Sequence, residues 1–310
     1  EHPRYSEALS DGVLAVGGRE EAFPSNLAEN LPGVKRSGRA YSAFLHQLRM
    51  DWYGHTADLA ERATGKDLSK KERMALANAI NVASGRGNVR GLDADGMNLM
   101  AKLTFSIRFA SSRVQYLSLA PLINPDATPR VKREIAKTYA QTIAGYSATV
   151  LLLSQLGGKV NKEDSREHNF LKMTFGNTDY DILGGLSKWI VFASRMADRD
   201  SNSSEKQFRM VRFLRGLASP SAGMAHDVII NQGKYYYRRD ESGKQVLIWD
   251  DSSDETRLKS AARLVREMMI PIGVDNIISA EEKGRPASET ARNSLAEALG
   301  FGVTNREDQK

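Results

Sequence analysis

Residues 128–158 read TPRVKREIAKTYAQTIAGYSATVLLLSQLGG, and this stretch decides the fold of the chain. Its first two residues, Thr128-Pro129, are typical of a helix N-cap followed by the first helical position. Gly157-Gly158 is typical of a C-terminal cap. After Lys137 no charged residue occurs until Lys159. We therefore expect one long central helix whose uncharged half is hidden from water, either in a protein core or in a lipid bilayer.

The uncharged half of this helix has the length of a membrane span, for which about 20 predominantly apolar residues suffice. Its small residues Gly145 and Ala148 permit close packing against another helix or contact with a membrane. Several polar side chains interrupt it, namely Thr138, Gln141, Thr142, Ser147, Thr149, Ser154 and Gln155. This polarity favours burial among neighbouring helices, and a conditional membrane or channel-lining role stays the alternative.

The composition is that of a folded protein, with 41% hydrophobic and 26% charged residues in a chain of 310. The absence of cysteine excludes disulfides, thiolate metal sites and cysteine nucleophiles. A net charge of +6 favours nucleic acid or an anionic membrane over acidic partners. The alternative is a solvated surface with a modest surplus of arginine.

Changes in composition along the chain predict three parts. Residues 1–36 are rich in Gly, Pro, Ser and Asn and predict an extended N-terminal arm. Residues 37–232 show helical periodicity and predict a helical core module, and residues 233–310 predict a hairpin followed by a C-terminal helical extension. The chain begins with Glu1 and shows no basic-then-apolar leader there, so we expect no signal peptide and a processed product or an excerpt of a longer polypeptide.

Two helices in the first half of the chain carry clear patterns. In the first, the spacing predicts one buried apolar face that consists of Tyr41, Phe44, Leu45, Leu48, Trp52 and Leu59. Arg49 falls on the opposite, polar face of that helix. The second helix follows a capping box, Ser69 to Glu72, and its spacing points Met74 and Ile80 inward.

Two hairpins interrupt the helical pattern. Gly176-Asn177 separates two short apolar segments, as a tight turn does. Residues 240–243 contain a glycine and separate a second pair of strands. The first strand of that pair carries the candidate contact residues Tyr235, Tyr236 and Tyr237. Aromatic residues beside Arg238-Arg239 occur in single-strand binders, but a strand at a subunit contact is the preferred interpretation. The expected fold is mainly α, a multi-helix bundle around the uncharged helix with two small hairpin inserts.

The sequence contains no recognisable catalytic motif. A Walker phosphate loop, a nucleophile elbow, a zinc-protease helix and a dinucleotide fingerprint are all absent. No pair of histidines has metal-ligand spacing on a helix, and carboxylate pairs such as Asp179/Asp181 are typical of turns and caps. We therefore expect no catalytic residue, no metal and no cofactor.

Two groups of arginines are candidates for contact with phosphate. In the loop Ser84–Asn88 two glycines flank Arg86, so backbone N–H groups could face a phosphate, with Arg86 and Arg90 adding charge. A second group forms a stripe on a predicted helix and consists of Arg209, Arg212 and Arg215, which could follow a DNA backbone. The alternatives are an ordinary structural turn for the loop and a solvated or acid-paired face for the stripe.

Three of these segments together resemble one known module. They are Arg39–Asp51 (RAYSAFLHQLRMD), Ile80–Gly87 (INVASGRG) and Phe170–Gly185 (FLKMTFGNTDYDILGG). The combination resembles the C-terminal module of the large polyvalent proteins of tailed bacteriophages and mobile elements, over about residues 37 to 232. The resemblance implies a protein that is packaged in the virion interior and delivered to the host cell with the genome, and it implies no catalytic residue.

The leading hypothesis is a non-enzymatic internal virion or ejection protein that assembles with itself or with other virion proteins, such as those of the portal or internal core. The alternative is a DNA-binding protective or antirestriction factor that is delivered with the genome. A wall-degrading enzyme is the third hypothesis, and it is disfavoured because no helix presents an isolated glutamate in an apolar setting.

Overall fold

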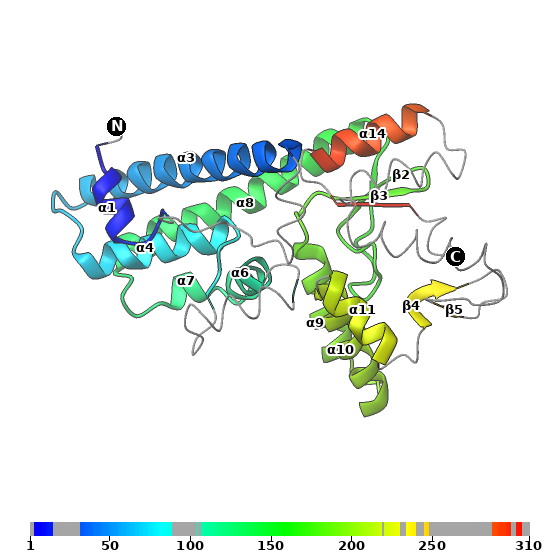
Figure 1. Cartoon of the computed structure of the whole chain (residues 1–310). Helices are drawn as coiled ribbons and strands as arrows, with labels where there is room; N and C mark the ends of the chain where they lie inside the picture. Colours follow the sequence, from blue (N-terminus) through cyan, green and yellow to red (C-terminus); the bar gives the residue numbers. More distant parts are fainter. Residues whose placement is uncertain are drawn as a thin grey trace. The chain divides into compact units, whose positions relative to one another are not determined.

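The computed structural model describes residues 3–14, 32–88, 104, 107–218, 220–229, 234–239, 245–247, 287–298 and 302–305. The chain divides into two compact units, unit 1 (residues 1–145) and unit 2 (residues 146–310). Helices dominate both, and small antiparallel strands are inserted in unit 2 (Figure 1), which confirms the predicted fold class. The predicted boundaries after residues 36 and 232 stay predictions.

Unit 1 is helical. Its elements are α1 (Tyr5–Ser10), α3 (Pro32–Arg62), α4 (Lys70–Ala83), α6 (Ile107–Leu117), α7 (Ala120–Ile123) and the first part of α8 (Pro129–Gln155). Helix α4 contacts α3, α6 and α7, and α1 lies against α3 (Figure 1). The core between these helices includes Val13, Met50, Tyr53, Leu76, Ile80 and Val131. Many of its other members are alanines, which allow the helices to approach closely.

The capping box at the start of α4 is confirmed. The Ser69 hydroxyl accepts a hydrogen bond from the backbone N–H of Glu72, and the Glu72 carboxylate accepts one from the backbone N–H of Ser69 at 2.8 Å. Ile80 is buried as predicted, whereas Met74 is exposed. Met74 therefore lies on the solvent side of α4.

The predicted inward face of α3 is wrong for three of its six residues, whereas Leu45 is buried and Trp52 and Leu59 are partly buried. Tyr41 and Phe44 are exposed because they precede Leu45, where the packing on α3 begins, and Leu48 is exposed because it lies off the face that contains Arg49, Met50 and Tyr53. Arg49, expected on the polar face, is 1% exposed, and its Nε donates to Ser84 Oγ at 2.7 Å. The buried face of α3 continues through Met50, Tyr53, Ala57 and Ala60.

Residues 3–14 differ from the extended arm that the sequence predicts. Tyr5–Ser10 is helical, and Ala8, Val13 and Leu14 are buried in the core of unit 1. This segment is therefore part of the packed unit. The rest of the predicted arm up to residue 31 lies outside the described residues.

The long helix begins and ends where the sequence predicts. It is α8, which starts at Pro129, and Gly157 follows it with a left-handed φ of 88°. The predicted burial of its uncharged half is wrong, since the buried residues of α8 are Val131, Glu134 and Ile135 in the charged half. The core of unit 1 forms around that charged half. No described helix is long and apolar enough to cross a membrane.

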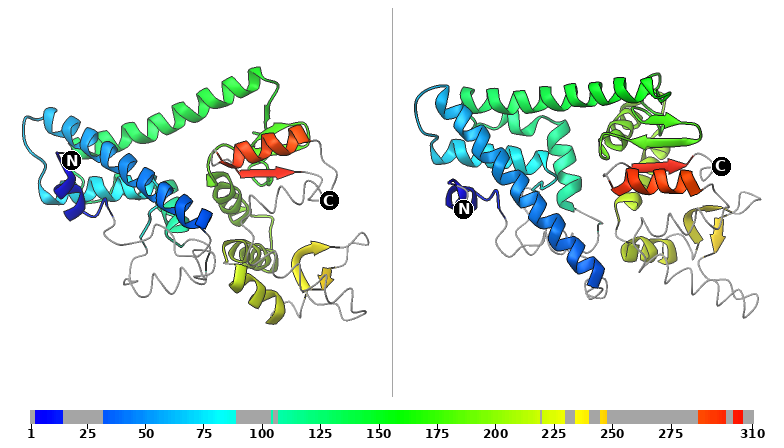
Figure 2. Two further views of the ribbon diagram at one scale, coloured as in Figure 1. Left: turned by 45° about the horizontal axis from the view of Figure 1, so that its top comes forward. Right: turned by 90° about the horizontal axis from the view of Figure 1, so that it is seen from above.

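Unit 2 contains a small sheet. Its strands are β1 (Lys159–Val160), β2 (Met173–Phe175), β3 (Thr178–Asp181) and β6 (Gly302–Asn305), all antiparallel, in the order β1-β2-β3-β6. The β2–β3 hairpin with its Gly176-Asn177 turn is confirmed, and Gly176 has a φ of 57°. Strand β6, which pairs with β3 from the far end of the sequence, was not predicted. Helix α14 (Ala287–Ala298) lies beside β6 (Figure 2).

The remaining described elements of unit 2 are α9 (Leu186–Ala197), α10 (Ser203–Leu217), α11 (Pro220–Ile229), β4 (Lys234–Arg239) and β5 (Gln245–Leu247). Phe213 of α10 stacks on Phe192 of α9 with ring centroids 3.9 Å apart, which joins the two helices. The sequence of residues 204–207, SEKQ, has the pattern of a capping box, but Asn202 caps α10 instead by accepting from the Glu205 N–H. The β4–β5 pair confirms the second hairpin. The sequence pattern also predicts helices over residues 95–100 and 254–269, and both segments lie outside the described residues.

Candidate functional site

Arginines from three segments of unit 2 meet at one place. Arg166 lies in the loop between β1 and β2, Arg195 in α9 and Arg209 in α10. Arg195 Nε donates to the backbone carbonyl of Arg166 at 2.6 Å, and Arg209 Nη1 donates to the carbonyl of Arg195 at 2.9 Å. Arg212 of α10 is close enough for its charge to act on Arg195. We call Arg166, Arg195, Arg209 and Arg212 the arginine cluster.

Two aspartates balance part of this charge. Arg166 binds Asp164 through Nε and Nη2, at 3.0 and 3.1 Å, and the pairing lowers the pKa of Asp164. Asp198 lies 3.4 Å from Arg166 Nη1 and 3.8 Å from Arg209 Nη1. Both carboxylates therefore lie on the Arg166 and Arg209 side of the cluster.

Arg195 forms no ion pair with a described carboxylate. Within the described part of the chain no carboxylate oxygen lies within 4.0 Å of its nitrogens. Burial lowers the pKa of Arg195, and the neighbouring charges of Arg212 and Arg209 lower it further. Asp164 acts in the opposite direction, but the described part of the cluster joins four arginines with only two aspartates and so carries a surplus of positive charge.

The predicted stripe of α10 is divided in the structure. Arg209 and Arg212 belong to the arginine cluster, whereas Arg215 forms a bidentate pair with Asp227 at 2.8 and 3.1 Å. The Asp227 carboxylate is buried and also lies 3.0 Å from His226 Nδ1. Arg215 thus joins α10 to α11. Sequence reasoning missed Arg166 and Arg195, which carry no local signal because they lie on other segments.

The loop around Arg86 is a structural turn. The backbone N–H groups of Arg86 and Gly87 donate to the carbonyls of Asn81 at 2.7 Å and Arg108 at 2.9 Å. A Cβ atom at Gly87 would lie 2.7 Å from the backbone of Ser111, so glycine is needed for close packing on α6. The N–H groups expected to face a phosphate are thus used within the protein, and Arg90 lies outside the described residues.

The C-terminal part of α8 is apolar on two sides in unit 2. Val150 and Leu153 pack against the sheet with Met173 and Tyr180. The opposite side carries four residues that we call the uncharged face: Ala148, Leu151, Leu152 and Leu156. The three leucines are 66%, 65% and 70% exposed. Exposed apolar side chains that lie together mark contact surfaces, so this exposed side is a candidate contact surface.

Two other groups of candidate contact residues give less information. Gly145, at the unit boundary, is exposed, and a Cβ atom built there meets no atom within 4 Å. Tyr235, Tyr236 and Tyr237 belong to strand β4, which pairs with β5, and their side chains lie outside the described residues. Their predicted role in assembly stays a prediction.

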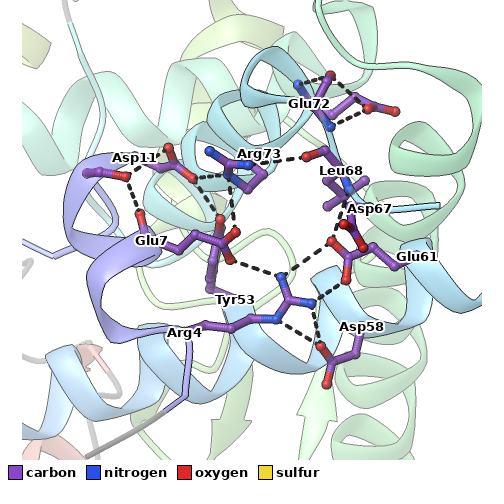
Figure 3. Close-up of polar contacts among 12 residues, drawn as sticks. Arg4, Glu7, Asp11, Tyr53, Asp58, Glu61, Asp67, Leu68, Glu72 and Arg73 are labelled. Carbon is purple, nitrogen blue, oxygen red and sulfur yellow. Dashed lines mark hydrogen bonds and ion pairs between the residues drawn. The ribbon is translucent and has the colours of Figure 1, made fainter.

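Unit 1 contains a network of charged side chains (Figure 3). Arg4 contacts Glu7, Asp58 and Glu61. The buried Asp11 carboxylate accepts from Tyr53 Oη at 2.8 Å and from Arg73 Nε at 2.9 Å, and burial raises the pKa of Tyr53.

The partners in this network come from α1, α3 and α4. The network therefore fastens α1 to the two longer helices, and it presents no unpaired nucleophile.

Unit 1 also contains a cavity of about 10 Å³, which has room for about one water molecule. It is lined mainly by apolar residues, which include Trp52, Leu76, Ile80, Pro121 and Ile135. Among the described residues no group of three or more histidines and carboxylates could hold a metal ion. The cavity is too small to hold a substrate.

The arginine cluster and the uncharged face are thus the two candidate sites in the part of the chain that the structure describes. No family model, curated protein or solved structure matches it. The resemblance to the bacteriophage module stays a prediction.

Proposed function

We propose that this chain is a non-enzymatic internal protein of a bacteriophage particle that assembles with further copies of itself through the uncharged face of α8. The observation that carries the proposal is the exposure of Leu151, Leu152 and Leu156 on a helix whose other side is already packed. Burying one leucine contributes about 1.5 to 3 kcal/mol. Three leucines on each of two copies are enough to offset part of the entropy cost of association.

The uncharged face is a place where a second copy can approach without charge repulsion. Each chain carries a net charge of +6, so two copies repel over most of their surfaces. Residues 138–158 carry no charge, and two such faces can meet without placing like charges together. A face that meets its own copy gives a symmetric, closed contact.

The sequence resemblance supports the biological setting. It implies a protein of the virion interior that enters the host with the genome, and other virion proteins, of the portal or internal core, are the competing partners. The proposal assigns assembly to the chain itself and needs no cofactor. Membrane contact by α8 is not part of the proposal.

A pair of matched variants tests the assembly. Leu152→Glu places a charge on the uncharged face, whereas Ile123→Glu makes the same change at an exposed residue of α7 in unit 1. We expect the wild-type chain and Ile123→Glu to form the same oligomer in mass photometry, and Leu152→Glu to be monomeric. Equal behaviour of the two variants would exclude the uncharged face as the contact.

The second candidate function is a DNA-binding protective factor, and the arginine cluster is the observation that favours it. Cations that contact phosphates release counterions, so binding to DNA would weaken linearly with the logarithm of salt concentration. Titration of the intact chain with labelled DNA at several salt concentrations tests this function. Binding that does not change with salt would contradict it.

A further inference from the structure

We infer that the arginine cluster binds a phosphate group of a nucleic-acid backbone, with Arg195 as its central ligand. The inference rests on the second candidate function and adds to it the binding residues and the chemical group bound. It moves the contact from the expected stripe on α10 to a site shared by α9, α10 and the loop between β1 and β2.

The free hydrogen-bonding capacity of Arg195 points to an anion. Its Nε donates to the carbonyl of Arg166 at 2.6 Å, and its terminal NH₂ groups donate to no atom of the described residues. A guanidinium edge of this kind forms two parallel hydrogen bonds to a phosphate. The carbonyl bond fixes the plane of the guanidinium, which reduces the entropy cost of binding.

The surroundings of Arg195 favour an anion from outside the unit. Arg209 is held in place by the Arg195 carbonyl at 2.9 Å and by Ser201 Oγ at 2.7 Å, so the two side chains stay close. Asp198 lies 3.8 Å from Arg209, and Asp164 is bound by Arg166. An external anion between Arg195 and its arginine neighbours would remove the repulsion that these charges now share.

A nucleic acid fits better than a free phosphate ion. Phe208 of α10 is 57% exposed, and an exposed aromatic ring can stack on a base. The net charge of +6 also attracts a polyanion over a long range. The exposed apolar residues of α10 make an anionic membrane the main competitor, and the test separates the two.

The test uses the intact chain and fluorescein-labelled single-stranded and duplex oligonucleotides in fluorescence anisotropy. Arg195→Gln should weaken binding about tenfold or more, because a charge-assisted hydrogen bond to phosphate is lost. The slope of log affinity against log salt should fall by about one. The matched control is Arg133→Gln, at an exposed position of α8 in unit 1, which removes the same charge and should leave the slope unchanged.

A second variant tests the site even if Arg195→Gln does not fold. Arg212→Gln changes an exposed residue of α10 and should weaken binding in the same way, with the circular dichroism of the wild type retained. DNA binding by the wild type with equal losses in Arg195→Gln and Arg133→Gln would overturn the site and leave the DNA-binding function standing. Binding to vesicles that contain anionic lipid, without binding to either oligonucleotide, would overturn both.

Discussion

Replacing Glu72 by glutamine should destabilise unit 1 by about 3 kcal/mol. The Glu72 carboxylate accepts from Arg130 Nε and Nη2 at 2.8 and 2.9 Å, from Thr128 Oγ1 at 2.6 Å, and from both the backbone N–H and the hydroxyl of Ser69 at 2.8 Å. It is nearly buried, and removing one partner of a buried ion pair costs about 3 to 5 kcal/mol. A glutamine side chain keeps one acceptor oxygen and turns an amide donor toward Arg130.

The lower end of that range applies because Arg130 keeps other partners. Its Nη1 donates to Thr64 Oγ1 at 2.6 Å and to the Lys66 carbonyl at 2.7 Å, and Nη2 donates to the Asp67 carbonyl at 2.9 Å. These bonds hold the guanidinium in place when the carboxylate is gone. The loss is therefore mainly that of the charge-assisted bonds to Glu72.

The stability of unit 1 should also depend on pH through Glu72. The Arg130 hydrogen bond is the largest cause that holds the pKa of Glu72 below its ordinary value. Because the folded pKa is depressed, the stabilisation is fully present above the unfolded pKa of about 4.3 and is lost as pH falls from there through the folded pKa. The difference in unfolding free energy between the wild type and Glu72→Gln should therefore shrink as pH drops below about 4.

Urea unfolding monitored by far-ultraviolet circular dichroism measures both effects. The control is Glu163→Gln, which makes the same change at an exposed residue of the loop after β1 and should alter stability by no more than about 0.5 kcal/mol. Equal stabilities of the two variants near neutral pH would refute the role of Glu72. A wild-type advantage that stays constant on acidification would refute its electrostatic origin.

Four further substitutions have effects that follow from the structure. Gly145→Ala should stabilise α8 by about 0.5 to 1 kcal/mol, because the added methyl group meets open space on a helix. Gly87→Ala should unfold part of unit 1, because its methyl group would collide with backbone atoms. Thermal unfolding should therefore show a higher midpoint for the first variant and a lower one for the second. Met173→Ala should destabilise unit 2 by about 2 to 5 kcal/mol in urea, since Met173 is fully buried between the sheet and α8. Asp11→Asn should lower the free energy of local unfolding of α1 by about 1.5 to 3 kcal/mol, because the Asp11 contacts with Tyr53 and Arg73 are weakened. Hydrogen exchange should become faster in α1 alone. Unchanged exchange would contradict the role of these contacts.

Local signals in the sequence predicted their elements well. The capping box at Ser69, the turn at Gly176-Asn177 and the start of α8 at Pro129 each depend on residues a few positions apart. The physical chemistry of a cap or a tight turn is complete within such a segment. These features could therefore be predicted without knowledge of the packing.

Burial could not be predicted in the same way. Tyr41 and Phe44 share a face with Leu45, but α3 is covered by other helices only from about Leu45 onward. Arg49 is buried because Ser84, which is distant in sequence, accepts its hydrogen bond. Periodicity shows which residues share a face of a helix. Tertiary contacts decide how much of that face is buried.

The candidate sites show the same limit. The spacing of Arg209, Arg212 and Arg215 predicted one stripe, but Asp227 of α11 binds Arg215, and Arg195 of α9 takes its place beside the other two. The uncharged stretch of α8 was visible in the sequence, but its exposure was not. A long uncharged helix indicates a surface that is to be covered, and the sequence does not say whether the cover is the same chain or a partner.

The measurement that tests the proposed function most directly is sedimentation velocity of the wild-type chain over a series of concentrations, beside Leu152→Glu. We expect the wild type to shift from the monomer mass of 34.3 kDa to a defined multiple of it, while the variant stays monomeric and folded. A wild type that remains a monomer at every concentration would contradict assembly through the uncharged face of α8. An oligomer that persists unchanged in Leu152→Glu would contradict it equally.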